Sequence, residues 1–188
     1  MEKQAFDKLN LFFSRFKKLA FKKGETILQA GDEPSGVLYI KKGYVRLYSL
    51  SKDAQEFTLI IFQAEDFFPI MWAINGTPNA YYMEAITDVE LYQAPREEFV
   101  NFIKKGETLF EITSRILTRL GGTLTRMEYA VFGNAYNKVA SIILICAERF
   151  GSLRGQDIFI QVPLTHSDIA NLIGSQKLVE ESAFDQFN

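Results

Sequence analysis

The stretch FKKGETILQAGDEPSGVLYIKKGYVRLY, Phe21–Tyr48, decides the fold of this chain. Two runs rich in Val, Leu, Ile and Tyr flank Lys41-Lys42-Gly43, which predicts a β-hairpin in which Gly43 takes the positive φ of a tight turn. Similar short runs, separated by turn residues, continue from Thr26 to Pro95. This pattern predicts a small all-β barrel or roll.

Helical periodicity replaces the β pattern after Pro95. Apolar residues then recur every three or four positions, which predicts one apolar stripe on a long helix. A stripe that follows a complete β domain needs a partner to cover it, and the same helix of a second chain is the most economical choice. We therefore expect a homodimer held by Leu109, Ile112, Ile116, Leu120, Leu124, Met127 and Val131.

The composition bounds the class of protein. With 188 residues, 47% of them apolar, the chain is expected to form one sizeable core or two small domains. Its formal charge of -2 means that any DNA contact needs a local basic patch. One cysteine, Cys146, and one histidine, His166, are too few for a disulfide, a zinc site or an iron–sulfur cluster. We expect no metal, no cofactor and a reducing cytoplasm.

The segment before the β region has apolar residues at helical spacing, namely Phe6, Leu9, Phe13, Phe16 and Leu19. We interpret it as a helix packed on the following sheet. A less favoured alternative is a membrane-surface helix, because four lysines cluster between Lys17 and Lys23. The longest strongly apolar run, Val139–Ala147, is far shorter than the roughly 20 residues of a membrane-spanning helix, so neither a span nor a secretory signal is predicted.

The order of a β-roll, a long helix and a helix-turn-helix resembles the cyclic-AMP-receptor and fumarate-nitrate-reduction (Crp/Fnr) family of bacterial transcription regulators. The resemblance is carried by Phe21–Tyr48, by EDFF at residues 65–68 and by PLTHSDIANLIG at residues 163–174. It implies an α+β fold in three parts. These are a cyclic-nucleotide-binding-like β-roll with flanking helices (1–105), a dimerisation helix (106–133) and a truncated winged helix-turn-helix DNA-binding domain (134–188).

The resemblance also implies a place for an effector. Members that bind a cyclic nucleotide carry a glycine–glutamate pair and an arginine–serine pair, where this chain has Pro69-Ile70 and Asn79-Ala80. A cyclic phosphate bound there would lose its hydration without gaining a cation as partner, which costs free energy. We therefore predict no cyclic AMP binding. The segment either holds a less polar ligand or is filled core, and the second interpretation is favoured. The candidate residues are Phe68, Ile70, Trp72, Asn79, Ala80 and Tyr81.

The last motif is the first half of a helix-turn-helix. Thr165 is a good N-cap, Asp168 completes a capping box, and Gly174 suits the sharp turn. The family's recognition helix then carries arginines that pair with guanine, whereas SQKLVEESAFDQFN, residues 175–188, has one lysine and no arginine. We expect a truncated DNA reader without wing strands. The DNA-contact candidates are Thr165, His166, Ser167, Ser175, Gln176 and Lys177.

These observations predict a homodimeric Crp/Fnr-type transcription regulator with a degenerate effector pocket and an incomplete DNA-reading domain. DNA, an unknown effector and RNA polymerase are the partners that the resemblance implies. The alternative is a dimeric sensor module that binds a small molecule or another protein and never DNA. An enzyme is not expected, because no phosphate-binding glycine loop and no serine, histidine and carboxylate constellation is found.

Overall fold

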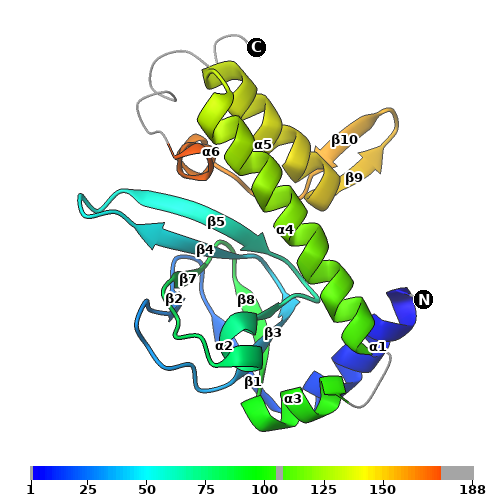
Figure 1. The fold of residues 1–188 in the computed structure, drawn as a ribbon. Helices are drawn as coiled ribbons and strands as arrows, with labels where there is room; N and C mark the ends of the chain where they lie inside the picture. Colours follow the sequence, from blue (N-terminus) through cyan, green and yellow to red (C-terminus); the bar gives the residue numbers. More distant parts are fainter. Residues whose placement is uncertain (1, 105–107, 175–188) are drawn as a thin grey trace. The chain divides into compact units, whose positions relative to one another are not determined.

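A computed structural model describes residues 2–104 and 108–174 of the chain (Figure 1). These residues form two compact units. The first contains Met1–Tyr48 and Ile60–Leu117, and the second contains Ser49–Leu59 and the described residues from Thr118 onward. Both units therefore take up two separate segments of the sequence.

The first unit is built on two four-stranded sheets. Their strand orders are β1-β8-β3-β6 and β2-β7-β4-β5. The pairs β1–β8, β3–β8, β3–β6, β2–β7 and β4–β7 are antiparallel. The β region predicted from Thr26 to Pro95 is thus confirmed, interrupted by one short helix. The elements are α1 (Glu2–Phe13), β1 (Lys17–Phe21), β2 (Thr26–Leu28), β3 (Val37–Lys42), β4 (Val45–Leu50), β5 (Glu56–Phe62), β6 (Phe67–Phe68), α2 (Ile70–Asn75), β7 (Tyr82–Ala85), β8 (Val89–Ala94) and α3 (Arg96–Lys104).

The predicted hairpin is wrong in its pairing, because β3 and β4 follow one another along the chain but belong to different sheets. The predicted turn between them does form, and it requires glycine. Gly43 has a φ of 95°, in the left-handed region, and a Cβ there would collide with the backbone carbonyl of Asp88. In β4, Val45 and Leu47 are buried while Arg46 between them is half-buried. This alternation is expected of a strand with one face in a core.

Helices and sheet share an aromatic core in the first unit. The rings of Phe13 in α1 and Tyr39 in β3 are stacked with their centroids 4.7 Å apart, and Phe13 also meets Phe99 of α3 at 5.7 Å. Fully burying an aromatic or aliphatic side chain contributes about 1.5–3 kcal/mol each. The buried members of this cluster are Leu9, Phe12, Phe13, Val37, Tyr39, Phe67, Ala73, Ala94, Phe99, Ile103 and Ile112.

The N-terminal helix is shorter than its apolar spacing predicts. It ends at Phe13, and Leu19 lies in strand β1, where it pairs with Leu91 of β8. Backbone hydrogen bonds to β8 override local periodicity here, because a strand edge offers partners that helical spacing cannot reveal. The lysines therefore lie on β1 and the following turn, and the alternative of a lysine-rich helix end at a membrane is wrong.

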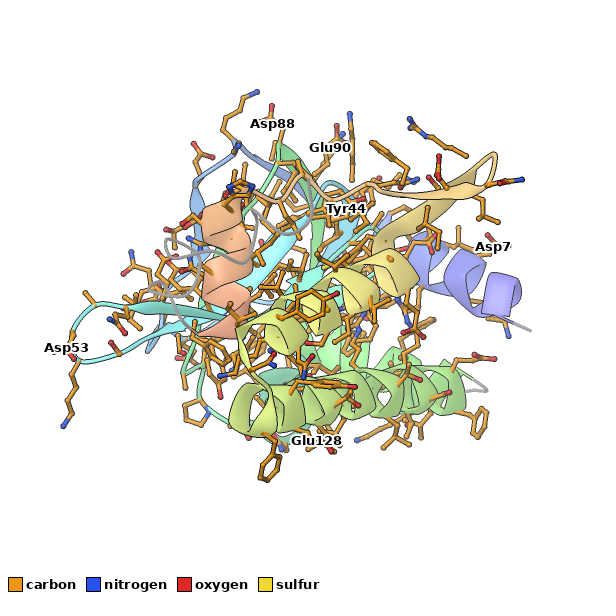
Figure 2. The ribbon with its side chains drawn as sticks, turned by 90° about the horizontal axis from the view of Figure 1, so that it is seen from above. Asp7, Tyr44, Asp53, Asp88, Glu90 and Glu128 are labelled. Carbon is orange, nitrogen blue, oxygen red and sulfur yellow. The ribbon has the colours of Figure 1, made fainter. Side chains whose placement is uncertain are left out.

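Two of these lysines pair with carboxylates of the neighbouring strand region. Lys18 Nζ lies 2.7 Å from Glu90 and Lys22 Nζ lies 2.8 Å from Asp88. Asp88 and Glu90 project close together (Figure 2). Both pairs are exposed, so they contribute little to stability.

The second unit contains the tip of the β4–β5 hairpin and most of the helical part of the chain. The long helix α4 begins in the first unit and continues into the second. The elements are α4 (Thr108–Phe132), α5 (Ala135–Phe150), β9 (Gly151–Arg154), β10 (Asp157–Ile160) and α6 (His166–Ile173), with β9 and β10 antiparallel. In the described ranges, none of the helices combines the length and apolarity needed to cross a bilayer.

Helix α5 has a side-chain cap at its beginning and a strand directly after its end. The Asn134 side chain accepts a hydrogen bond from the Asn137 N–H at 2.9 Å and caps the first turn. Gly151 follows the last helical residue, but its backbone is extended (φ -79°, ψ 145°). The extended conformation arises because Gly151 is already the first residue of β9.

Candidate functional site

Three of the effector-pocket candidates contribute to the core of the first unit. Phe68 is buried, and its ring stacks on that of Phe62 at 5.2 Å. Ile70 and Trp72, both on α2, are partly buried and pack against the aromatic cluster. Their apolar surface is thus covered by neighbouring side chains.

Helix α2 is held at its C-terminal end by Arg96. The Nε of Arg96 donates to the carbonyls of Trp72 and Ala73 at 3.1 and 3.0 Å, and its guanidinium lies 5.6 Å from the centre of the Trp72 ring. A cation at this end satisfies carbonyls that lack helical partners and complements the helix dipole. Gly76, with a φ of 75°, then ends the helix.

Asn79 stands where the family's arginine is expected. It is buried and forms hydrogen bonds with the backbone of the loops around it. Its Nδ2 donates to the carbonyls of Gln29 and Tyr81 at 2.7 and 2.8 Å, and its Oδ1 accepts from the Tyr81 N–H at 3.4 Å. Both amide hydrogens are therefore engaged. Ala80 is exposed and Tyr81 is half-buried.

The predicted dimerisation stripe is divided by the structure. Ile112 is buried in the aromatic cluster of the first unit and Ile116 packs against it. Leu109, Leu120, Leu124 and Met127 expose 47%, 51%, 56% and 55% of their surface. The side chain of Val131 lies outside the described residues. Among the described side chains of the stripe, the four exposed ones are those available to a second chain.

The first half of the helix-turn-helix forms as predicted. The Asp168 N–H donates to Thr165 Oγ1 at 3.2 Å, and the Thr165 N–H donates to Asp168 Oδ2 at 2.7 Å, which completes the capping box. Ala170, Leu172 and Ile173 are buried, and Gly174 ends α6 in the left-handed conformation with a φ of 67°.

The candidate DNA contacts fall into two groups. Thr165, His166 and Ser167 are exposed at the N-terminal end of α6, where backbone N–H groups and the helix dipole favour a phosphate. Ser175, Gln176 and Lys177 lie outside the described residues.

Contacts that the sequence analysis missed join α6 to the first residues of β5 within the second unit. Asn171 Nδ2 donates to Glu56 Oε2 at 3.0 Å. A Cβ on Gly174 would lie 3.2 Å from the ring of Phe57, so the ring sits directly against the turn. More than a hundred residues separate these partners, and no local pattern signals such contacts.

The remaining ionisable groups of interest are Cys146 and the acidic residues. Burial raises the pKa of the Cys146 thiol to about 11, which makes it a poor nucleophile at neutral pH. Among the described residues, no group of three His, Cys, Asp or Glu side chains could hold a metal ion. Glu128 projects from the side of α4 (Figure 2).

Comparison with known proteins agrees with this architecture. Residues 18–106 match the family model of the cyclic nucleotide-binding domain. The global nitrogen regulator of Nostoc sp. is 27% identical over 161 residues, which cover 84% of this chain and 72% of that relative. The CRP-like cAMP-activated global transcriptional regulator of Mycobacterium tuberculosis is 25% identical over 168 residues, or 89% of this chain and 75% of the relative.

Solved structures share the fold. A CooA mutant from Carboxydothermus hydrogenoformans has a TM-score of 0.75 at 23% identity and covers 93% of this chain and 77% of that one. The c-di-GMP responsive global regulator CLP of Xanthomonas campestris has a TM-score of 0.78 at 15% identity, over 96% and 90% of the two chains.

The first unit thus defines a protein with a cyclic nucleotide-binding domain. Over 84–89% of its length the chain is homologous to regulators of the Crp/Fnr type, which agrees with the predicted resemblance.

Proposed function

We propose that this protein is a homodimeric, DNA-binding regulator of transcription. The observation that carries the proposal is helix α6 of the second unit, which begins with a capping box and ends in a left-handed glycine. The chain that carries this helix is homologous to a transcription regulator. This helix is the first half of a helix-turn-helix. The candidate contacts at its exposed N-terminal end, His166 and Ser167, suit a phosphate of the DNA backbone.

The dimer is proposed to form through α4. Leu120, Leu124 and Met127 are spaced by four and three residues and are each about half exposed on one helix, which is the spacing of a helix–helix seam. A second copy of α4 supplies the same residues by two-fold symmetry. A two-fold protein then reads a two-fold DNA site.

The effector, if one binds, is proposed not to be cyclic AMP. Ile70 packs against the core and has no acceptor for a ribose hydroxyl. Asn79 is neutral and directs both amide hydrogens to backbone carbonyls, so it offers no cation to a cyclic phosphate. The relatives carry names with different nucleotides, cyclic AMP for one and c-di-GMP for another. The shared fold therefore leaves the ligand open. Isothermal titration with cyclic AMP tests this proposal, and micromolar binding contradicts it.

DNA binding is tested by fluorescence anisotropy over a series of salt concentrations, with sites selected from random duplexes. We expect the logarithm of the affinity to fall steeply with the logarithm of the salt concentration, because phosphate contacts release counterions. The double variant His166→Glu, Ser167→Glu places two carboxylates at the α6 N-terminus and should weaken binding at least tenfold. The matched control is Gln156→Glu, Gln161→Glu, two exposed positions of the same unit, which should bind like the parent protein.

A second candidate function is a dimeric sensor module that does not bind DNA. The specific observation in its favour is charge: residues 165–188 contain one lysine and no arginine against Asp168, Glu180, Glu181 and Asp185. Carboxylates beside a phosphate backbone repel it. Retained dimerisation without salt-dependent DNA binding supports this alternative, and it also indicates that the DNA-reading part of this chain is incomplete.

The remaining partners follow from the regulator proposal. A regulator of transcription acts on chromosomal DNA, so we place the protein in the bacterial cytoplasm. RNA polymerase is the partner through which an activator works.

A further inference from the structure

Helix α6 is enclosed on two opposite sides at its C-terminal end. Ile173 and Ile142 of α5 line the same small cavity, so this side of α6 faces the neighbouring helix. Asn171 precedes Ile173 by two positions, which places its side chain about 200° away around the helix axis. Yet only 5% of Asn171 is exposed. A side chain that points away from α5 is buried only when another element covers it.

The covering element is the beginning of strand β5, which belongs to the same unit as α6. Asn171 Nδ2 donates to Glu56 Oε2 at 3.0 Å. A Cβ on Gly174 would lie 3.2 Å from two carbons of the Phe57 ring, so the ring fills the space beside the turn that ends α6. Glu56 and Phe57 thus hold a side chain and the turn of the same helix end, and we call these two contacts the β5 clasp.

The clasp is also attached to helix α4. Arg126 Nη2 donates to the Leu59 carbonyl at 2.6 Å. The Arg126 guanidinium lies 5.6 Å from the centre of the Phe57 ring, within the range of a cation–π interaction. The first residues of β5 therefore lie between α4 and α6, and they have contacts that remain when α6 moves away.

The contact between β5 and α6 contains an unsatisfied polar group. Asn171 Oδ1 is buried and has no hydrogen-bond partner among the described residues. An acceptor buried in this way loses its hydration without replacement, and it regains water when α6 separates from β5. Opening of the clasp therefore recovers part of the free energy that its contacts lose.

The position of the clasp conflicts with DNA binding by the helix-turn-helix. In that motif the residues directly after the turn enter the major groove, while the first helix crosses the DNA backbone. The Phe57 ring lies against the turn itself, so β5 stands next to the residues that DNA has to reach. The Glu56 carboxylate beside the same helix end would also repel the phosphates.

We propose that the β5 clasp is an autoinhibitory contact, which keeps the helix-turn-helix from DNA until α6 separates from Glu56 and Phe57. This inference rests on the proposed function, since it concerns DNA binding. A protein whose competent form is a minor fraction binds its ligand more weakly by that fraction. Loosening the clasp should therefore raise the affinity for DNA, although it removes contacts that stabilise the unit. A merely structural contact would not have this effect.

The first test removes the aromatic ring in the full chain. Phe57→Ala should tighten DNA binding about three- to tenfold in fluorescence anisotropy on the selected duplex. Hydrogen exchange of the α6 amides should become several-fold faster, because α6 separates from β5 more often. Leu50→Ala shortens an exposed apolar residue on the neighbouring strand β4 of the same unit. It is the matched control and should behave like the parent in both measurements.

The second test uses Glu56 at constant charge. Glu56→Ala and Glu56→Gln both remove one carboxylate, so they change the electrostatic attraction of DNA equally. The glutamine keeps an acceptor for Asn171 Nδ2, whereas the alanine does not. Glu56→Ala should therefore bind DNA at least twofold more tightly than Glu56→Gln. Glu56 is only half-buried, so this pair keeps the test valid if Phe57→Ala does not fold.

The two readouts separate this inference from the proposed function. DNA binding by the parent with no gain in Phe57→Ala and Glu56→Ala leaves the proposed function intact and overturns autoinhibition. Faster α6 exchange with weaker DNA binding also overturns it, because the contact then supports the DNA-binding form. If neither the parent nor any variant binds DNA, the proposed function fails and autoinhibition fails with it. Binding by Phe57→Ala with a parent that binds none supports both.

Discussion

Arg115 and Asp66 form a largely buried ion pair in the first unit, with Nη2 of Arg115 2.7 Å from Oδ1 of Asp66. The Asp66 side chain is only 2% exposed, and its other oxygen accepts from the Gln63 N–H at 3.0 Å. A second contact runs from Nη1 of Arg115 to the Glu65 carbonyl at 3.2 Å. The beginning of α4 is therefore fastened to the turn that carries the EDFF motif.

Removing Arg115 should destabilise the first unit strongly, because the Asp66 carboxylate would remain buried without its cation. We expect Arg115→Gln to lower the free energy of unfolding by about 2–3 kcal/mol, below the cost of breaking a fully buried pair because Arg115 is partly exposed. Denaturant unfolding measures this change. Asp66→Asn in the Arg115→Gln background should restore part of the loss; equal stability of the single and double variants contradicts the ion-pair explanation.

Removing the N-cap of α6 should loosen that helix. Thr165→Ala loses the acceptor for the Asp168 N–H, and we expect a cost of about 1 kcal/mol in the opening of α6. Hydrogen exchange of the α6 amides measures the effect. Thr165→Ser keeps the hydroxyl and is the control, which should exchange within a few tenths of a kcal/mol of the parent. Equal exchange in the alanine and serine variants would show that the capping box does not stabilise α6.

Truncating Asn79 should destabilise the loops that it joins. Asn79→Ala removes two hydrogen bonds to backbone carbonyls at 2.7 and 2.8 Å, at a cost of about 1–3 kcal/mol in denaturant unfolding. Asn79→Arg should be no less destabilising and should not create cyclic AMP binding, because Ile70 remains where the family has glutamate. Nucleotide binding by Asn79→Arg alone contradicts our view of this segment.

Charging the exposed part of α4 should separate the dimer. Leu120→Glu, Leu124→Glu places like charges face to face across the proposed seam. We expect the mass measured by light scattering to fall from two chains to one, with the helical circular dichroism retained. Thr118→Glu, an exposed position about half a turn away from Leu120, is the matched control. Dissociation by the control alone would place the interface on another face.

The buried thiol predicts a pH dependence of stability. The pKa of Cys146 is raised by burial from 9.0 to about 11, so its stabilising contribution is complete below about pH 9 and is lost as the pH rises through 11. The measurement is the difference in the free energy of unfolding between the parent and Cys146→Ala, in which the other titrating groups cancel. We expect this difference to change by about 1–2 kcal/mol, to the disadvantage of the parent, between pH 7.5 and pH 10.5. A difference that does not change with pH contradicts a buried, neutral thiol.

The sequence by itself determined the features that depend on local backbone geometry. The positive φ of Gly43, the Thr165–Asp168 capping box and the turn at Gly174 were all predicted, because each requirement involves residues within a few positions. The pairing of the strands on either side of Gly43 was predicted wrongly, because it depends on which distant strand each one meets. The short runs of β-forming residues separated by turn residues from Thr26 to Pro95 likewise determined a β-roll, since both the strand preference and the turns are local properties.

Only the tertiary structure decided which residues pack against each apolar side chain and which groups form hydrogen bonds with each polar one. Leu19 follows a helical pattern yet pairs with β8, and Ile112 shares a stripe with Leu124 yet is buried within its own chain. Periodicity identifies a face but not what covers it, because the covering residues are distant in the sequence. The same holds for Asn79, whose amide donates to the Gln29 carbonyl, and for Arg126, which is buried with its Nε lacking a hydrogen-bond partner among the described residues. Long-range contacts set the desolvation and pairing of each group, and no local pattern encodes them.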